Sequence, residues 1–101
     1  MHLITLKNWS VEDFGKVIES SLELKTAPVR YAGVMKGRNL ALLFQKTSTR
    51  TRCAGEVGIT QLGGHALYLD WQNTNFGLAD LGDEFRVLSS YSDFIVARLL
   101  E

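Results

Sequence analysis

The sequence has one cysteine, Cys53, one proline, Pro28, and no excess of either charge, with 11 basic and 11 acidic residues. A lone cysteine can form neither an intramolecular disulfide nor a thiolate metal cluster. A formal charge of zero disfavours binding to nucleic acid or anionic lipid through bulk charge, because such binding needs a basic excess. We therefore expect no nucleic-acid partner, and any ligand must be bound by a local group of residues.

Long apolar runs are also missing. No stretch approaches the roughly 20 residues that cross a bilayer, and the N-terminus Met1 to Thr5 lacks the pattern of an export signal. We expect no membrane partner and a cytoplasmic location, or the mitochondrial matrix if a transit peptide has been removed. The apolar content of 46% is enough for an ordinary hydrophobic core, so we interpret residues 1–101 as one domain.

The first periodic segment predicts a helix from Ser10 to about Lys25. Ser10 and Asp13 have the spacing of a capping box, and Trp9 can pack on Phe14 as a hydrophobic staple. The apolar residues that share one face of this helix are Val11, Phe14, Val17, Ile18 and Leu22.

Three short apolar runs predict buried strands, and helices are predicted between them. The expected strands are Leu40 to Phe44, Ala66 to Leu69 and Phe94 to Ala97; the expected helices are about Thr49 to Leu62, with Cys53 in the core, and a segment opened by Asp80 and Asp83. This order predicts an α/β fold with an open parallel sheet and helices on both faces, in three layers. Because three strands are few for such a sheet, we expect an incomplete domain of a longer protein.

Ligands of an open parallel sheet bind beyond the carboxyl ends of its strands. The segment Ser48 to Arg52 follows the first predicted strand and begins a helix, where unpaired N–H groups and hydroxyls can accept a phosphate. Arg50 adds a guanidinium that can bind two phosphate oxygens at once. Arg98 follows the third strand at the same edge.

The sequence contains neither the Walker pattern nor the G-x-G-x-x-G pattern, which weakens the case for nucleotide binding.

Arg50 and Arg52 cannot both face one ligand. Residues two apart on a helix point about 200° from each other. Arg52 lies four residues before Glu56, so we expect it to form an ion pair within the helix or between subunits.

The run from Phe44 to Arg52, with its S-T-R-T-R motif, and the following Q-L-G-G-H-A from Gln61 to Ala66 resemble the carbamoyl-phosphate-binding domain of the aspartate/ornithine carbamoyltransferases. Arg86 to Leu88 and Asp93 to Arg98 are similar to a helix and strand of the ornithine branch. The resemblance implies transfer of a carbamoyl group from carbamoyl phosphate to an amine, without cofactor, metal or covalent intermediate. It also implies an assembly of trimers.

By the same resemblance, Ser48, Thr49, Arg50 and Thr51 would bind the phosphate, and Thr51 and Arg98 would bind the carbamoyl oxygen. A neighbouring subunit would add a residue from the loop after the second strand. That loop departs from the family's usual S-x-Q pattern, and we expect Asn75 in this role, with Gln72 second. Trp71 would either shape a neighbour's amine pocket or pack at a subunit contact.

The family's amine-binding motifs do not occur in these 101 residues, so the acceptor is not specified by the sequence. The ornithine-type resemblance favours L-ornithine, giving L-citrulline and phosphate, and putrescine or an N-acylornithine are the alternatives. A fragment of this length would be inactive alone. If it were a complete natural product, a non-catalytic phosphate-binding or oligomerisation module would be the alternative.

Overall fold

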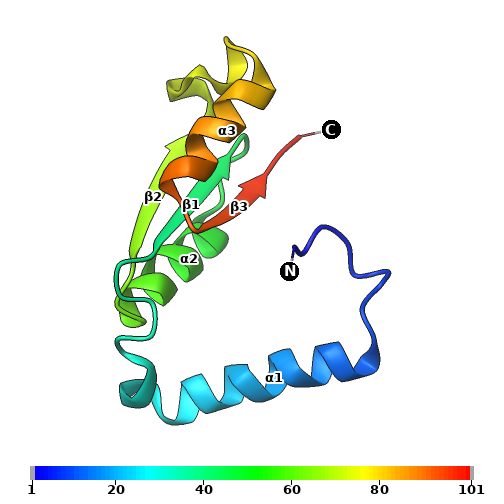
Figure 1. Ribbon diagram of the computed structural model, residues 1–101, viewed down its shortest axis with the longest axis vertical. Helices are drawn as coiled ribbons and strands as arrows, with labels where there is room; N and C mark the ends of the chain where they lie inside the picture. The colour runs from blue at the N-terminus through cyan, green and yellow to red at the C-terminus, as the bar shows by residue number, and fades with distance from the viewer. Residues whose placement is uncertain (1, 101) are drawn as a thin grey trace. The chain divides into compact units, whose positions relative to one another are not determined.

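The computed structural model describes residues 2–100, and the chain divides into two compact units, Met1–Tyr31 and Ala32–Glu101 (Figure 1). The two units are described separately below. Within the described residues, no helix is both long and apolar enough to span a bilayer.

The first unit contains helix α1 (Val11–Thr26) and the short 3-10 helix η1 (Pro28–Tyr31). The predicted capping box is present, because the Asp13 amide donates to Ser10 Oγ and the Ser10 amide donates to Asp13 Oδ2, both over 3.0 Å. The Trp9 and Phe14 rings lie 5.5 Å apart, which confirms the staple. The structure therefore confirms this helix and its start.

The second unit contains the parallel sheet. Its elements follow the order β1 (Asn39–Phe44), α2 (Thr49–Gln61), β2 (His65–Asp70), α3 (Leu81–Tyr91) and β3 (Phe94–Arg98). The strand order in the sheet is β2-β1-β3, and both pairings are parallel. The predicted α/β class, the parallel sheet and the alternation of strands and helices are confirmed.

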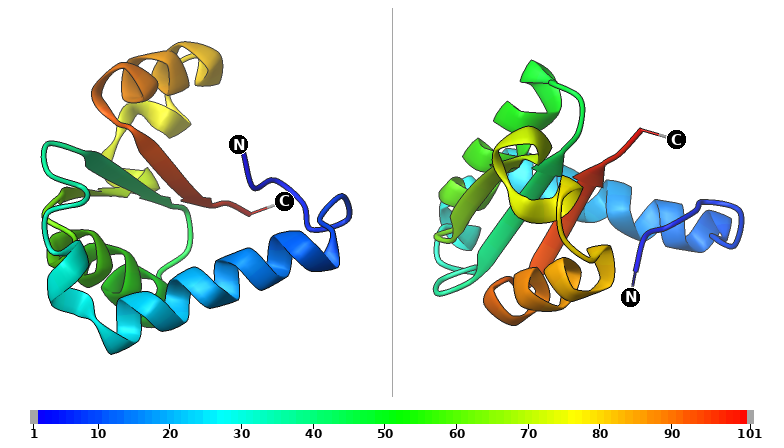
Figure 2. Two further views of the ribbon diagram at one scale, coloured as in Figure 1. Left: turned by 60° about the horizontal axis from the view of Figure 1, so that its bottom comes forward. Right: turned by 90° about the horizontal axis from the view of Figure 1, so that it is seen from above.

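Helices α2 and α3 cover opposite faces of the sheet (Figure 2). Alternate residues of β1 point to alternate faces. Leu42 faces α2, where a Cβ on Gly55 would lie only 2.8 Å from Leu42 Cδ2. Ala41 and Leu43 face α3 and form a core cluster with Phe76 and Leu88. The predicted three-layer arrangement is thus present.

Only residues 41–44 of the central strand are fully buried, which corrects the expectation of three buried strands, since β2 is half-buried and β3 is mostly exposed. Residues 41–44 of β1 are 0–1% exposed, whereas Phe94 and Val96 of β3 are 45% and 42% exposed. The reason is the strand order, because β1 has a neighbour on each side while β3 lies at an edge. Helix α2 contacts β1 and β2, so it leaves this face of β3 open.

The prediction that Cys53 lies in the core is wrong, because its side chain is exposed. Gly55 packs against Leu42 of the sheet, and Ile59 is buried beside Gly64 in the turn before β2. Cys53 lies two residues before Gly55, about 200° away around the helix, and therefore points outward.

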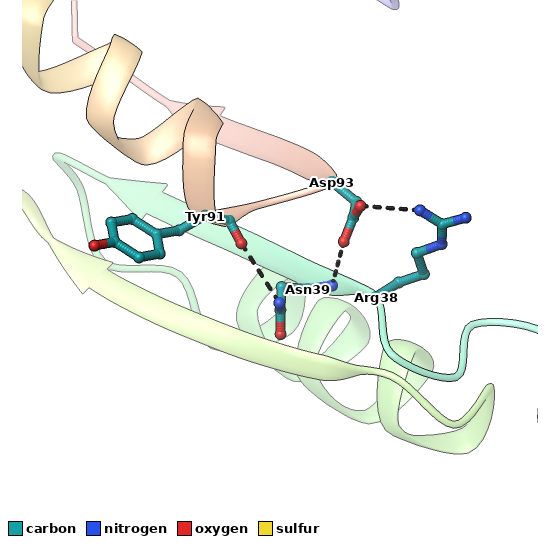
Figure 3. Close-up of polar contacts among 4 residues, drawn as sticks. All are labelled: Arg38, Asn39, Tyr91 and Asp93. Carbon is teal, nitrogen blue, oxygen red and sulfur yellow. Dashed lines mark hydrogen bonds and ion pairs between the residues drawn. The ribbon is translucent and has the colours of Figure 1, made fainter.

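A polar cluster joins the starts of β1 and β3 (Figure 3). The Asp93 carboxylate accepts hydrogen bonds from the Asn39 amide, over 2.8 Å, and from Arg38 Nη1, over 3.1 Å. The Asn39 side chain also donates to the Tyr91 carbonyl oxygen, over 3.4 Å. The hydrogen bond from the Asn39 backbone, together with Arg38, lowers the pKa of Asp93 below its usual range. These bonds fix the register in which β3 joins the sheet.

Candidate functional site

The three strands end side by side. In the sheet register, Phe44 at the end of β1 pairs with Asp70 of β2 on one side and with Arg98 of β3 on the other. The loops that follow β1 and β2 therefore leave the sheet at one edge, and Arg98 lies at that same edge. This is the edge at which a ligand is expected from the sequence.

The loop after β1 is attached to β3 by Gln45. The Gln45 amide donates to the Arg98 carbonyl oxygen over 2.9 Å, and Gln45 Oε1 accepts from the Leu100 amide. These bonds hold the start of the loop and the residues around Arg98 together. Sequence reasoning missed this role, because nothing in the local pattern links Gln45 to a segment 55 residues away.

Helix α2 begins directly after this loop. Ser48 is extended, with φ −155° and ψ 112°, and its Oγ caps the helix by accepting from the Thr51 amide over 3.4 Å. The amides of Thr49 and Arg50 have no intrahelical acceptor, because the first turn of any helix lacks one. Ser48 is half-buried and the next three side chains are exposed. The helix start therefore presents N–H groups, hydroxyls and the positive end of the helix dipole to solvent.

Arg50 and Arg52 leave the helix in different directions, as expected. Arg52 forms the predicted ion pair with Glu56, with 2.7 Å between Nε and Oε2, and its guanidinium lies 3.5 Å above the centre of the Tyr68 ring. The hydrogen bond that Arg52 donates to the Glu56 carboxylate raises the pKa of Arg52. Arg50 and Arg98 are exposed and form no ion pair with any residue in the range 2–100. Their two permanent charges are available to an anion.

The loop after β2 consists of two 3-10 turns, η2 (Trp71–Asn73) and η3 (Asn75–Gly77). The Trp71 ring lies 5.4 Å from Phe76, which is buried in the core cluster next to α3. Trp71 therefore packs on the core of its own chain. The side chains of Gln72 and Asn75 are exposed at the surface of this loop.

The described residues hold no group of three or more His, Cys, Asp or Glu side chains with the geometry of a metal site. The start of α2 and Arg98 supply hydroxyls, backbone N–H groups and guanidinium groups. All of them donate hydrogen bonds, and together they suit an oxyanion.

Comparison with known proteins identifies the family. The model of the aspartate/ornithine carbamoyltransferase carbamoyl-P binding domain matches residues 1–101. The chain belongs to this family. A catabolic ornithine carbamoyltransferase of Halobacterium salinarum is 35% identical to it over 101 residues, which are 99% of this chain and 34% of that protein.

Solved structures give the same result. The anabolic ornithine carbamoyltransferase of Campylobacter jejuni superposes with a TM-score of 0.89 at 34% identity, over 99% of this chain and 32% of that one. An N-acetyl-L-ornithine transcarbamylase superposes with a TM-score of 0.82 at 29% identity, over 97% of this chain and 32% of that one. The chain thus has the fold of the carbamoyltransferase carbamoyl-phosphate-binding domain and spans about a third of the length of these relatives.

Proposed function

We propose that the protein containing this chain transfers the carbamoyl group of carbamoyl phosphate to the side-chain amine of L-ornithine. The observation that carries the proposal is the position of the S-T-R-T-R segment at the start of α2, directly after the strand that pairs with Arg98. Two guanidinium groups that form no ion pair within residues 2–100, the hydroxyls of the segment and a helix N-terminus belong to segments that meet at one edge of the sheet.

In this proposal the groups of the chain bind both ends of carbamoyl phosphate. Ser48, Thr49, Arg50 and Thr51 bind the phosphate. Thr51 and Arg98 donate hydrogen bonds to the carbamoyl oxygen. Their positive potential lies where negative charge develops on that oxygen in the transition state, and such stabilisation lowers the barrier.

The reaction needs no covalent enzyme intermediate. The neutral amine nitrogen attacks the carbonyl carbon, and a carbon–nitrogen bond forms. The bond between that carbon and the bridging phosphate oxygen then breaks, phosphate leaves with the electron pair, and the amine loses one proton. Arg50 stabilises the charge of the departing phosphate. Catalysis then comes from holding both reactants in line and from electrostatic stabilisation.

The acceptor amine is proposed from the relatives. Ornithine carbamoyltransferases match at 35% identity over 101 residues, and the N-acetyl-L-ornithine transcarbamylase at 29%. The higher identity favours ornithine, and the second similarity keeps an N-acylated ornithine as the competing acceptor. Both enzymes would use the same donor site.

We also propose that the protein forms trimers in which the loop Asp70 to Gly77 reaches a neighbour's donor site. Asn75 would contact the neighbour's phosphate, and Gln72 is the second candidate. The loop is suited to this role, because its backbone is fixed by Trp71 and Phe76 while these two polar side chains are exposed.

The test is a substrate screen of the intact protein that carries this chain. Carbamoylated product is measured with ornithine, N-acetylornithine and putrescine at equal concentrations of carbamoyl phosphate. The proposal expects ornithine to give the highest kcat/KM. If only another amine gives product, that amine replaces ornithine as the proposed acceptor. If the protein binds phosphate but no amine gives product, the non-catalytic phosphate-binding module is favoured.

A further inference from the structure

The clearest feature outside the proposed ligand contacts is a stack of side chains beneath the first turn of α2. The Arg52 guanidinium lies 3.5 Å above the centre of the Tyr68 ring. Tyr68 in turn packs edge-on against Phe44, with 5.6 Å between ring centres and 80° between ring planes. The stack therefore connects α2, β2 and β1.

The two ends of this stack flank the loop between β1 and α2, residues 45–48, which leads into the proposed carbamoyl-phosphate site. Phe44 is the last residue of β1, and the loop begins with the next residue. Arg52 is the fourth residue of α2, and its amide donates to the Ser48 carbonyl oxygen over 3.3 Å, closing the first turn. Phe44 before the loop and Arg52 after it both contact the Tyr68 ring. The start of α2 therefore has little freedom to move.

Glu56 holds the guanidinium in this orientation. It accepts from Arg52 Nε over 2.7 Å, one turn further along α2. An arginine is suited to this position, because its planar guanidinium can stack on an aromatic face while an edge nitrogen donates to a carboxylate. A lysine could keep the charge but not the planar stack.

We propose that Arg52 is a positioning residue whose stack on Tyr68 holds the first turn of α2 in the geometry that binds phosphate. This inference rests on the proposed function, because it assigns Arg52 a role toward the same donor site. Arg52 does not touch the ligand. It acts through the backbone of the first turn, where Thr49, Arg50 and Thr51 lie.

The test compares three single variants of the intact protein and the double variant of Arg52→Lys with Tyr68→Leu. Arg52→Lys keeps the charge and loses the planar stack, and Tyr68→Leu removes the ring. Tyr68→Phe keeps the ring and is the matched control. The first readout is hydrogen exchange of the amides from Thr51 to Glu56 in the absence of ligand, and the amides of β1 serve as the internal reference. The second readout is the Kd for inorganic phosphate from calorimetry.

We expect Arg52→Lys and Tyr68→Leu to speed exchange at the start of α2, and to weaken phosphate binding, by roughly three- to tenfold each. The double variant should be no worse than Tyr68→Leu alone, because that single variant already removes the ring on which Arg52 stacks. Tyr68→Phe should match the wild type in both readouts. Exchange in β1 should not change in any variant.

The outcomes separate this inference from the proposed function. Unchanged exchange at the start of α2 in Arg52→Lys would overturn the positioning role, even if the wild type binds phosphate. Faster exchange limited to the start of α2, in a protein whose wild type does not bind phosphate, would show that the stack holds the first turn in place and would overturn the donor site. Equal effects of Tyr68→Phe and Tyr68→Leu would also overturn the role of the aromatic stack.

Discussion

The amide of Gln45 donates a hydrogen bond to the carbonyl oxygen of Arg98, with 2.9 Å between nitrogen and oxygen. This bond extends the contact between β1 and β3 one residue past the paired strands. It places Gln45, the first residue of the loop that leads to the S-T-R-T-R segment, beside the strand end that carries Arg98. Five predictions follow from the geometry around this edge and from the sheet that supports it.

The cluster around Asp93 makes stability depend on pH. Its hydrogen bonds hold the pKa of Asp93 below the ordinary value of an aspartate. A lowered pKa in the folded state contributes stability that is present at neutral pH and is lost as the pH falls through the folded pKa. Asp93→Asn should therefore reduce stability at pH 7 and flatten the fall in stability below about pH 4. Denaturant unfolding between pH 2 and 7 measures both effects, and an acid dependence identical to the wild type would contradict them.

Close packing of α2 on β1 requires a glycine at position 55. A Cβ there would lie 2.8 Å from Leu42 Cδ2, and Leu42 is completely buried. Gly55→Ala should lower the free energy of unfolding by about 1–3 kcal/mol, because the core cannot adapt without strain. Gly58→Ala is the control on the same helix, where nothing lies within 4 Å, and it should raise stability by about 0.5–1 kcal/mol. Chemical denaturation measures the free energy of unfolding of both variants. Equal changes in Gly55→Ala and Gly58→Ala would contradict the close approach of α2 to β1.

Ser48 has two separable roles, as the cap of α2 and as a proposed phosphate ligand. Ser48→Ala should cost about 1 kcal/mol of stability through the lost cap and should also weaken phosphate binding. Ser48→Asp keeps a good cap, so stability should return, but its negative charge should abolish phosphate binding. Thermal unfolding and calorimetry separate the two roles. Ser10→Ala is the control, since it removes the cap of α1 and should leave phosphate binding unchanged.

A site shared between subunits can be tested by complementation. Arg50→Ala and Asn75→Ala proteins should each be nearly inactive. Mixed trimers of the two should recover activity, because a site that takes Arg50 from one subunit and Asn75 from the other is intact. The activity of the re-assembled mixture is compared with that of each parent treated in the same way. Failure to recover, in a mixture shown to contain hybrid trimers, would count against Asn75 and move the role to Gln72.

Much of the fold was predictable because its signals are local. Ser10, Ser48 and Asp80 each cap a helix, and all three accept hydrogen bonds as their positions in the sequence suggest. The apolar run of β1 matches a central strand buried on both faces. The S-T-R-T-R segment also lies at a helix start, as expected. Each of these features depends on residues within a few positions of one another.

Other features depend on contacts distant in sequence and were not predictable. The open face of β3 results from the strand order, which places Phe94 at an edge. The prediction for the sheet-facing side of α2 was wrong. Gly55 faces the sheet, because a residue without a side chain allows the close approach, whereas the apolar Cys53 faces solvent. The stack of Arg52 on Tyr68 joins two elements whose pairing is fixed only by the folded chain.

We propose that the start of α2 binds the phosphate of carbamoyl phosphate through Arg50. Calorimetric titration of the intact protein with carbamoyl phosphate, comparing wild type with Arg50→Ala, measures this contact. Arg86→Ala is the control, because Arg86 is an exposed arginine of α3 that pairs with Asp83. We expect a loss of affinity of at least about 100-fold for Arg50→Ala, since two charge-assisted hydrogen bonds are removed, and no change for Arg86→Ala. Equal affinity of the wild type and Arg50→Ala would contradict it.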